Sequence, residues 1–455
     1  MSSEPSPECF TWSEPSKMTK IEHTVEAANA RLRQDMLAPL TRFSGPYWIA
    51  ASLCLVVIAF AGFAWANQLA YGIGAAGIRR PVYWGFYIIN FVFWIGISHA
   101  GTLISAILRL TDAGWRKPVT RAAEAITVFA LMIGGLFPII HLGRAWLFYW
   151  LIPYPNERLL WANFRSPLLW DMTAIFTYVT GSLLYLYLPM IPDLAMMGRR
   201  FGGLRGKIYR ALAIGWRGSD RQWHALEFAM KLMAAIILAV AVSVHSVVAF
   251  DFSMAVAPMW HSTIFAPYFV AGAIFSGIAA LVIALASLRK FLRLEAYLKP
   301  MHFHNLSKLL LLMSIVWAYF TVSDHLTAWY GGDPLDMRVF NAREHGPFAF
   351  WFWLMVVCNF VVPFVLLGIK KLRTIPTIIF SSCTVLLGMW LERFLIVVPT
   401  LANPPLAAAA GSYSPSWVEL AITAGTFAAM ILLYLIFTRL VPIIAIWEYE
   451  HETIS

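Results

Sequence analysis

The chain has 455 residues, of which 60% are hydrophobic and only 13% are charged, and its mean hydropathy is +0.68. Soluble domains carry roughly 25% charged residues, so this composition excludes a protein whose main surface faces water. The formal net charge of +10 could indicate nucleic-acid binding, but the basic residues lie beside apolar stretches, a pattern that orients membrane helices and leaves no nucleic-acid surface.

Ten apolar stretches are long enough to cross the hydrocarbon core of a bilayer, which takes about 20 residues in a helix. Because lipid cannot satisfy backbone groups, each stretch predicts a helix. The alternating segments that are typical of a transmembrane β-barrel do not occur in the sequence. In chain order, the predicted helices span residues 46–68, 83–108, 121–147, 167–190, 229–249, 265–288, 308–330, 347–368, 376–398 and 417–440.

Lys and Arg gather before the first predicted helix and after the second, fourth, sixth and eighth, and they are scarce in the opposite loops. The positive-inside rule therefore predicts a multi-pass protein of the cell inner membrane with both termini in the cytoplasm. We expect residues 1–45 to form a cytoplasmic N-terminal tail, residues 46–440 the transmembrane domain, and residues 441–455 a cytoplasmic C-terminal tail. Residues 1–45 show no signal-peptide pattern.

A faint internal repeat subdivides the transmembrane domain. HLGRAW (141–146), late in the third helix, has a counterpart in HLTAW (325–329), late in the seventh. Since both copies would start on the same side of the membrane, they would be parallel repeats. The pattern predicts an all-α fold in which two four-helix bundles, residues 83–249 and 265–398, are flanked by the first and tenth helices.

Ionisable side chains within hydrocarbon cost roughly 2.5–3.5 kcal/mol each on insertion scales, so they mark candidate functional sites. His141 ends the third helix and Asp171 begins the fourth, so we expect both near the outer face, with Arg144 on the same helical face as His141. An imidazole and a carboxylate in one pocket could hold the two oxygens of a quinol and accept its protons. The structural alternative is an ion pair that locks these two helices together.

Other intramembrane polar residues form a looser set that could conduct protons. For each of them alone, interhelical hydrogen bonding or charge pairing explains its presence at least as well. The candidates are His99, Glu124, His245, Asp251, Asp324, His325, Glu392 and Arg393. The four cysteines form no CxxC or CxxCH motif, so we expect no thiolate metal site, iron–sulfur cluster or c-type haem in the chain.

The segments PVYWGFYIINFVFWIGISHAGTLISAILRL (81–110), FPIIHLGRAW (137–146) and NFRSPLLWD (163–171) strongly resemble the NrfD/polysulfide-reductase family of membrane subunits, in particular the ActC and ActF subunits of alternative complex III. The resemblance implies a quinol or menaquinol substrate with His141 and Asp171 as its ligands, and no redox cofactor in the chain itself. It also implies three kinds of partner: an iron–sulfur subunit similar to molybdopterin oxidoreductases, a second NrfD-like subunit, and cytochrome c subunits.

These observations favour a quinol-binding subunit of a respiratory oxidoreductase that passes electrons to a partner on the outer side and is not a complete enzyme by itself. A related alternative is an NrfD-like subunit that serves proton translocation and assembly without its own active quinol site. Two alternatives are less favoured. A cytochrome b is considered because four histidines lie in predicted helices. A secondary transporter is disfavoured because such proteins place their binding residues near the bilayer midplane, whereas His141 and Asp171 are expected near the outer face.

Overall fold

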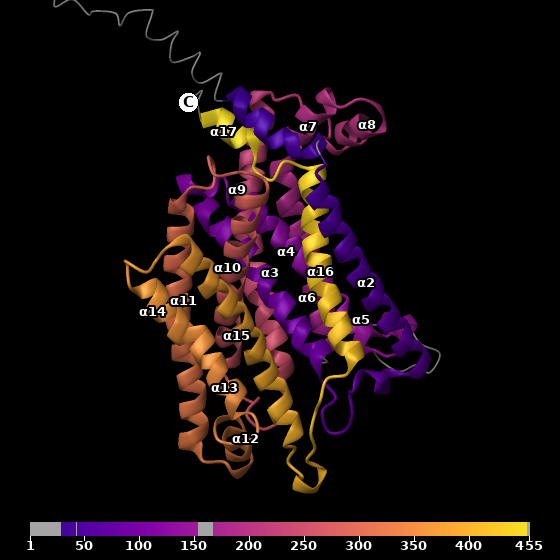
Figure 1. Cartoon of the computed structure of the whole chain (residues 1–455), viewed down its shortest axis with the longest axis vertical. Helices are drawn as coiled ribbons and strands as arrows, with labels where there is room; N and C mark the ends of the chain where they lie inside the picture. The colour runs from indigo at the N-terminus through magenta and orange to yellow at the C-terminus, as the bar shows by residue number, and fades with distance from the viewer. Residues whose placement is uncertain (1–28, 42, 153–166, 453–455) are drawn as a thin grey trace, which may run out of the picture.

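The structure is a computed structural model that describes residues 29–41, 43–152 and 167–452. Most of the predicted N-terminal tail and residues 153–166 of the predicted outer loop lie outside this range. Within it, ten helices are long and apolar enough to cross a membrane, which confirms an all-α, multi-pass membrane protein (Figure 1). They are α2 (Gly45–Tyr71), α3 (Phe86–Leu110), α4 (Thr120–Gly134) with α5 (Phe137–His141), α6 (Pro167–Tyr187), α9 (Asp220–Ser253), α10 (Phe265–Phe291), α11 (Pro300–Gly331), α13 (Ala349–Val356) with α14 (Val362–Gly368), α15 (Ile375–Ala402) and α16 (Trp417–Leu440).

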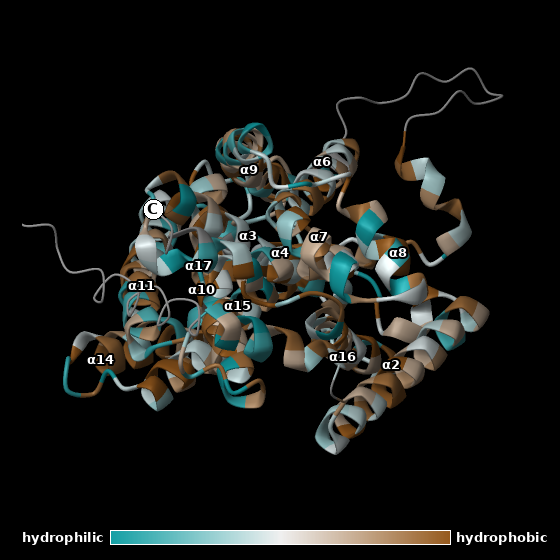
Figure 2. Ribbon diagram, turned by 90° about the horizontal axis from the view of Figure 1, so that it is seen from above, coloured by the Kyte–Doolittle hydropathy of each residue, from teal (hydrophilic) through white to brown (hydrophobic). Residues whose placement is uncertain are grey.

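The helix packing agrees with the two predicted bundles. The first bundle consists of α3, α4, α6 and α9, and the second consists of α10, α11, α13–α14 and α15. Helix α3 lies at the centre of the molecule. In its most apolar stretch 94% of the residues are buried, because the helix packs against α4, α9, α10 and α15. Helices α2 and α16 pack mainly against each other at one edge of the molecule (Figure 2).

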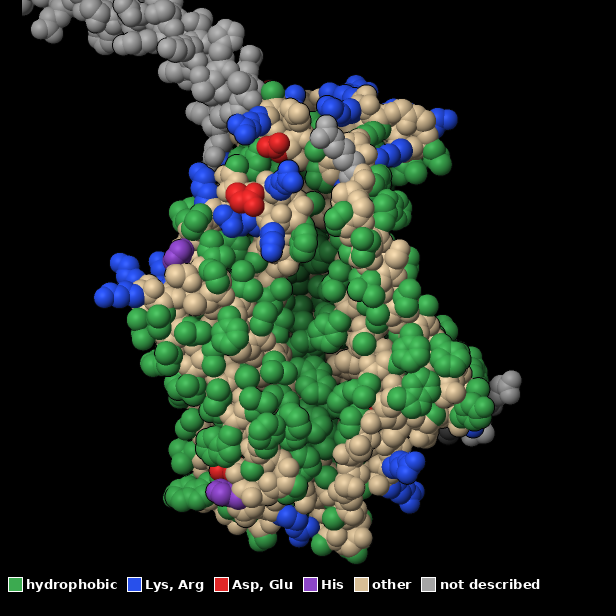
Figure 3. All heavy atoms as spheres, viewed as in Figure 1, with side chains coloured by type: hydrophobic (Ala, Val, Ile, Leu, Met, Phe, Trp, Pro, Cys, Tyr) green, Lys and Arg blue, Asp and Glu red, His purple; other side chains and the backbone are tan. Residues whose placement is uncertain are grey.

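The two ends of the molecule differ in charge. At one end lie α7 (Ile191–Arg200), α8 (Gly203–Leu212), α17 (Ile446–Glu452) and the helical residues 29–41 (Figure 1). Lys and Arg side chains gather there, whereas apolar side chains dominate the middle of the visible surface (Figure 3). We call the end that carries α7, α8 and α17 the basic end. The opposite end carries the turn Ala145–Leu151 and α12 (Pro334–Glu344).

Two of the larger errors in the predicted helix boundaries have local causes. The predicted third helix, 121–147, ends at His141, because Gly143 adopts a left-handed conformation with φ of 69° that the helix cannot continue through. The predicted helix 229–249 begins earlier, at Asp220, because Ser219 and Gln222 form a capping box. The first correction moves Arg144 beyond the end of the helix.

Candidate functional site

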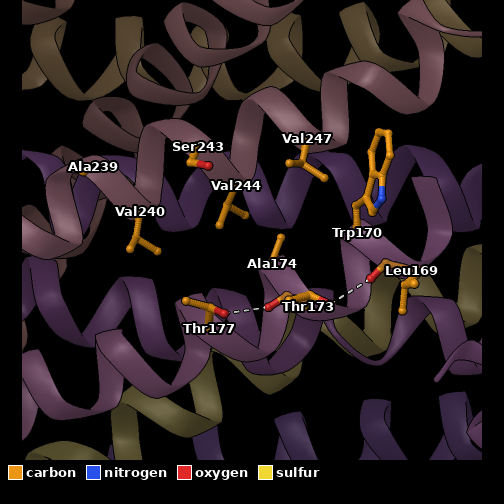
Figure 4. Close-up of a pocket in the computed structure, with 10 residues that line it drawn as sticks. All are labelled: Leu169, Trp170, Thr173, Ala174, Thr177, Ala239, Val240, Ser243, Val244 and Val247. Carbon is orange, nitrogen blue, oxygen red and sulfur yellow. Dashed lines mark hydrogen bonds between the residues drawn. The ribbon is translucent and has the colours of Figure 1, made fainter. Parts of the chain in front are cut away.

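A surface groove of about 830 Å³ lies between α6 and α9 of the first bundle. Its walls come from residues spaced three or four apart on the two helices, and most of them are apolar (Figure 4). The Thr173 and Thr177 hydroxyls donate to the carbonyls of Leu169 and Thr173, at 3.1 and 2.8 Å, so towards a ligand they offer only methyl groups and acceptor lone pairs. Such a groove suits an elongated apolar ligand with few polar groups. Its lining residues are Leu169, Trp170, Thr173, Ala174, Thr177, Ala239, Val240, Ser243, Val244 and Val247.

Two acidic side chains, Asp171 and Asp251, are close in sequence to groove residues on the side remote from the basic end, although neither is itself a lining residue. Asp171 follows the groove residue Trp170 on α6, and Asp251 stands one turn after the groove residue Val247 on α9. The two carboxyl groups lie within interaction range of each other, and Asp171 is only 7% exposed. Two carboxyl groups can bond only when one of them holds a proton. In the described part of the chain, Oδ1 of each makes no hydrogen bond, so these two oxygens are available to each other or to a ligand.

The predicted contact between His141 and Asp171 is not among the hydrogen bonds and ion pairs of the described residues. Both lie at the end opposite the basic end, as expected, but they face different neighbours. The His141 ring centroid is 6.5 Å from that of Tyr87 on α3, and its Nδ1 is buried without a described partner. Tyr87 donates to Gln68 at 2.5 Å, and Gln68 donates to the carbonyl of Ile140 at 2.9 Å. Sequence reasoning missed both Tyr87 and Gln68.

Arg144 does not share a helical face with His141, so that part of the sequence interpretation is wrong. The helix has ended at His141, and the backbone of Arg144 is no longer helical, with φ of −107° and ψ of 78°. A spacing of three residues places side chains together only inside a continuous helix. Whether Arg144 contacts a ligand stays a prediction.

Near the basic end, Glu124 belongs to a buried network of charges. Its carboxylate accepts a hydrogen bond from Ser105 at 2.6 Å and lies 3.6 Å from Arg109. Arg109 and Arg116 in turn lie 3.4 and 3.0 Å from Glu448 on α17. The C-terminal segment therefore covers the basic end of the first bundle directly above Glu124.

The structure brings His99 and His245 together in the centre of the molecule, where the two bundles meet. Their ring centroids are 4.3 Å apart, and both side chains are fully buried. His99 contacts the carbonyls of Ile95, at 3.1 Å, and of Ala241. Polar groups continue from His99 towards Glu124, since Thr127 and Tyr178 both donate to the carbonyl of Ser98, at 2.7 and 3.1 Å.

The acids of the second bundle lie beside basic partners. Glu392 and Arg393 form an ion pair at 2.5 Å, and Trp317 donates to Glu392 at 2.6 Å. Asp324 lies within electrostatic range of Arg343 on α12. Burial lowers the pKa of the Arg343 guanidinium, and the charge of Asp324 opposes that effect.

The neighbouring His325 lies 3.9 Å from Glu344. Sequence reasoning missed Arg343, because it lies between predicted helices and carries no motif. Among the residues described, no three of His, Cys, Asp and Glu come together as a metal site.

Comparison with known proteins gives a family and several relatives. The sequence model of the family described as "Polysulphide reductase, NrfD" matches residues 75–405, which include both bundles. The membrane subunit of a putative dimethyl sulfoxide reductase from Halobacterium salinarum is 27% identical over 433 residues, covering 88% of this chain and 92% of the relative. A subunit of the selenate reductase of Mesobacillus selenatarsenatis is 24% identical over 406 residues, covering 85% and 92%. The Hdr-like menaquinol oxidoreductase integral membrane subunit of Archaeoglobus fulgidus is 21% identical over 413 residues, covering 87% and 94%.

Proposed function

The chain belongs to the polysulphide reductase NrfD family, and on this premise we propose that it is the quinol-binding membrane subunit of a respiratory oxidoreductase complex. Quinol oxidation releases two electrons and two protons. The electrons pass to an iron–sulfur subunit of the molybdopterin-oxidoreductase type, so the chain alone is not a complete enzyme. The names of the relatives support this proposal, because two are subunits of reductases and the third is a subunit of a menaquinol oxidoreductase.

The acid pair Asp171 and Asp251 is the observation that carries the proposal. A quinol has a long apolar tail and a head with two hydroxyl groups; the α6/α9 groove offers apolar walls, and Asp171 and Asp251 follow the groove residues Trp170 and Val247 along the same two helices. With one shared proton, the pair can accept a second proton from a quinol hydroxyl, as general base catalysis requires. His141 lies at the same end, and its Nδ1 has no partner among the described residues; it is the proposed acceptor of the other quinol proton.

The charge distribution gives the proposed orientation. Positive loops favour the cytoplasm, which makes the basic end cytoplasmic and places the acid pair in the outer half of the inner membrane. The iron–sulfur partner then docks at the outer end, near the quinol. If the resemblance to ActC and ActF extends to the assembly, the partners also include a second NrfD-like subunit and cytochrome c subunits.

The test is Asp171→Asn in the assembled complex, with quinol oxidation and the composition of the complex measured together. Loss of a general base lowers rates by about 10²–10⁴-fold, so we expect a loss of that order with normal assembly. Asp251→Asn removes the other half of the pair and should also slow oxidation. Glu344→Gln, a carboxyl at the same end of the second bundle, is the matched control and should leave the rate unchanged. Unaltered oxidation in a normally assembled Asp171→Asn complex would reject the proposal.

A second candidate is a subunit that serves proton translocation and assembly and has no active quinol site of its own. The contact between His99 and His245 favours it. His245 is in contact with His99 of the first bundle and within electrostatic range of Arg393 of the second. Arg393 in turn forms an ion pair with Glu392. Two imidazole rings this close leave no room for a haem between them, whereas they suit proton transfer. In proteoliposomes that contain the complex, His245→Leu should abolish proton translocation while quinol oxidation continues. Translocation at the normal ratio of protons to electrons would exclude this route.

A further inference from the structure

The eighth membrane helix is interrupted by a π-turn, Val357–Val361, between α13 and α14. Such turns insert one extra residue into a helix and often occur at functional sites. Asn359 lies at the middle of this turn and is fully buried, with 0% of its surface exposed. Its backbone carbonyl accepts a hydrogen bond from Ser314 on α11 at 2.7 Å. The Oδ1 and Nδ2 atoms of its carboxamide, however, bond to no protein group in the described ranges.

The carboxamide of Asn359 points at a glycine of the neighbouring helix. A Cβ atom at Gly388 on α15 would lie 2.2 Å from Asn359 Oδ1, so the two helices approach closely only because residue 388 has no side chain. On α15, Ser381, Gly388 and Glu392 share one face, because they are seven and four residues apart. Ser381 Oγ is also buried without a partner among the described groups. Asn359 thus stands between an unpaired hydroxyl towards the basic end and Glu392 towards the opposite end.

Asn90 in the first bundle shows how a buried asparagine is normally satisfied in this protein. It is also 0% exposed, yet both ends of its carboxamide are bonded within the chain. Its Nδ2 donates to Thr423 at 2.7 Å, and its Oδ1 accepts from Trp390 at 2.9 Å. Buried polar groups are almost always paired with protein or with ordered water. The carboxamide of Asn359 therefore calls for a partner other than the described protein groups.

We propose that Asn359 binds an ordered water molecule inside the second bundle. Water donates and accepts hydrogen bonds at once, so a single molecule can satisfy Oδ1 and Nδ2 together. Buried waters typically make about three hydrogen bonds to groups that protein leaves unsatisfied, and the π-turn and the Ser314 hydroxyl add polar atoms beside the carboxamide. Water binding follows from these contacts alone. Only its consequence, a hydrated link between Ser381 and Glu392, rests on the proposed proton conduction.

The direct test is a cryo-EM map of the complex in a lipid nanodisc, at a resolution where buried waters are visible. We expect a density peak within hydrogen-bonding distance of Oδ1 or Nδ2 of Asn359, and none in Asn359→Leu, which keeps the size of the side chain but removes its polar atoms. If the wild-type carboxamide bonds directly to Ser381 or Ser314, or if the peak is missing while other buried waters are resolved, the proposal is wrong.

Two further variants keep the test informative should Asn359→Leu fail to fold. Asn359→Ser retains a hydroxyl and leaves more room, so the water peak should persist. Asn90→Leu is the matched control: it deprives Trp390 and Thr423 of their partner, and its melting temperature should fall by more than that of Asn359→Leu. Because the water site lies far along the chain from Asp171, failure of quinol oxidation to depend on Asp171 would reject the proposed function and leave the water site standing.

Discussion

The two bundles differ in the partners of their buried acids. In the first bundle, Asp171 lies within interaction range of another acid, Asp251, and follows the groove residue Trp170 on α6. In the second bundle, Glu392 forms an ion pair with Arg393 and receives a hydrogen bond from Trp317. In one copy of the repeated architecture two acids therefore lie together without a basic partner among the described ion pairs. In the other copy the acid is paired with an arginine.

This difference separates a candidate binding site from structural support. A buried charge with a close partner of opposite sign is explained by folding alone. Two neighbouring acids do not attract each other as an ion pair does, so folding stability does not explain them. Ionisable groups within the membrane are by default functional candidates. The comparison thus supports the proposed ligand site in the first bundle and charge pairing in the second, and both can be tested by mutation.

The largest effect is expected for Arg393→Met. Removing one partner of a buried ion pair leaves the other charge uncompensated and costs about 3–5 kcal/mol, measured as a lower free energy of unfolding of the protein in detergent. Asp171→Asn should change that free energy by about 1 kcal/mol or less, because a neutral amide can replace the shared proton.

The double variant Glu392→Gln with Arg393→Met is the control for this prediction. It removes both charges and should recover most of the lost stability. If Arg393→Met is as stable as the wild type, or if Asp171→Asn is the more damaging of the two, the contrast between the bundles fails.

Much of the fold was predictable from the sequence because lipid imposes simple rules. An apolar stretch that can cross the bilayer must be helical, and the ten predicted helices all occur. The match between HLGRAW and HLTAW was enough to predict two bundles, which the packing of α3 to α15 agrees with. Two of the larger boundary errors came from local features, the left-handed Gly143 and the capping box at Ser219.

The details of the site were harder to predict, because apolar length gives the depth of a residue but not the direction of its side chain. Asp171 has the expected depth, yet α6 is rotated so that this carboxyl faces α9 and meets Asp251. Sequence reasoning had paired it with His141 on the preceding helix. A helix with apolar residues on most faces carries little rotational information, so the neighbour that Asp171 has in the structure could not be chosen from the sequence.

The next prediction tests whether the groove sets the first bundle apart. Ala174→Phe places a ring in the groove on the α6 wall, and we expect the KM for quinol to rise about tenfold, equivalent to about 1.4 kcal/mol of lost binding. Leu183→Phe lies on the exposed surface of the same helix, outside the groove lining, and is the control. Equal KM values for the two variants would show that quinol does not use this groove.

The smallest effect concerns the relation between His141 and Asp171, and a double-mutant cycle on protein stability measures it. The two side chains share no described partner: His141 lies near Tyr87, and Asp171 lies within interaction range of Asp251. Mutations at independent sites add within about 0.3–0.5 kcal/mol, so His141→Gln and Asp171→Asn should give a coupling energy below that limit. Unfolding free energy is the right measurement, because two residues that serve one reaction can be coupled in rate without touching. A coupling of about 1 kcal/mol or more would mean that the two side chains meet directly, as the sequence predicted, and the acid pair would then no longer be the main contact of Asp171.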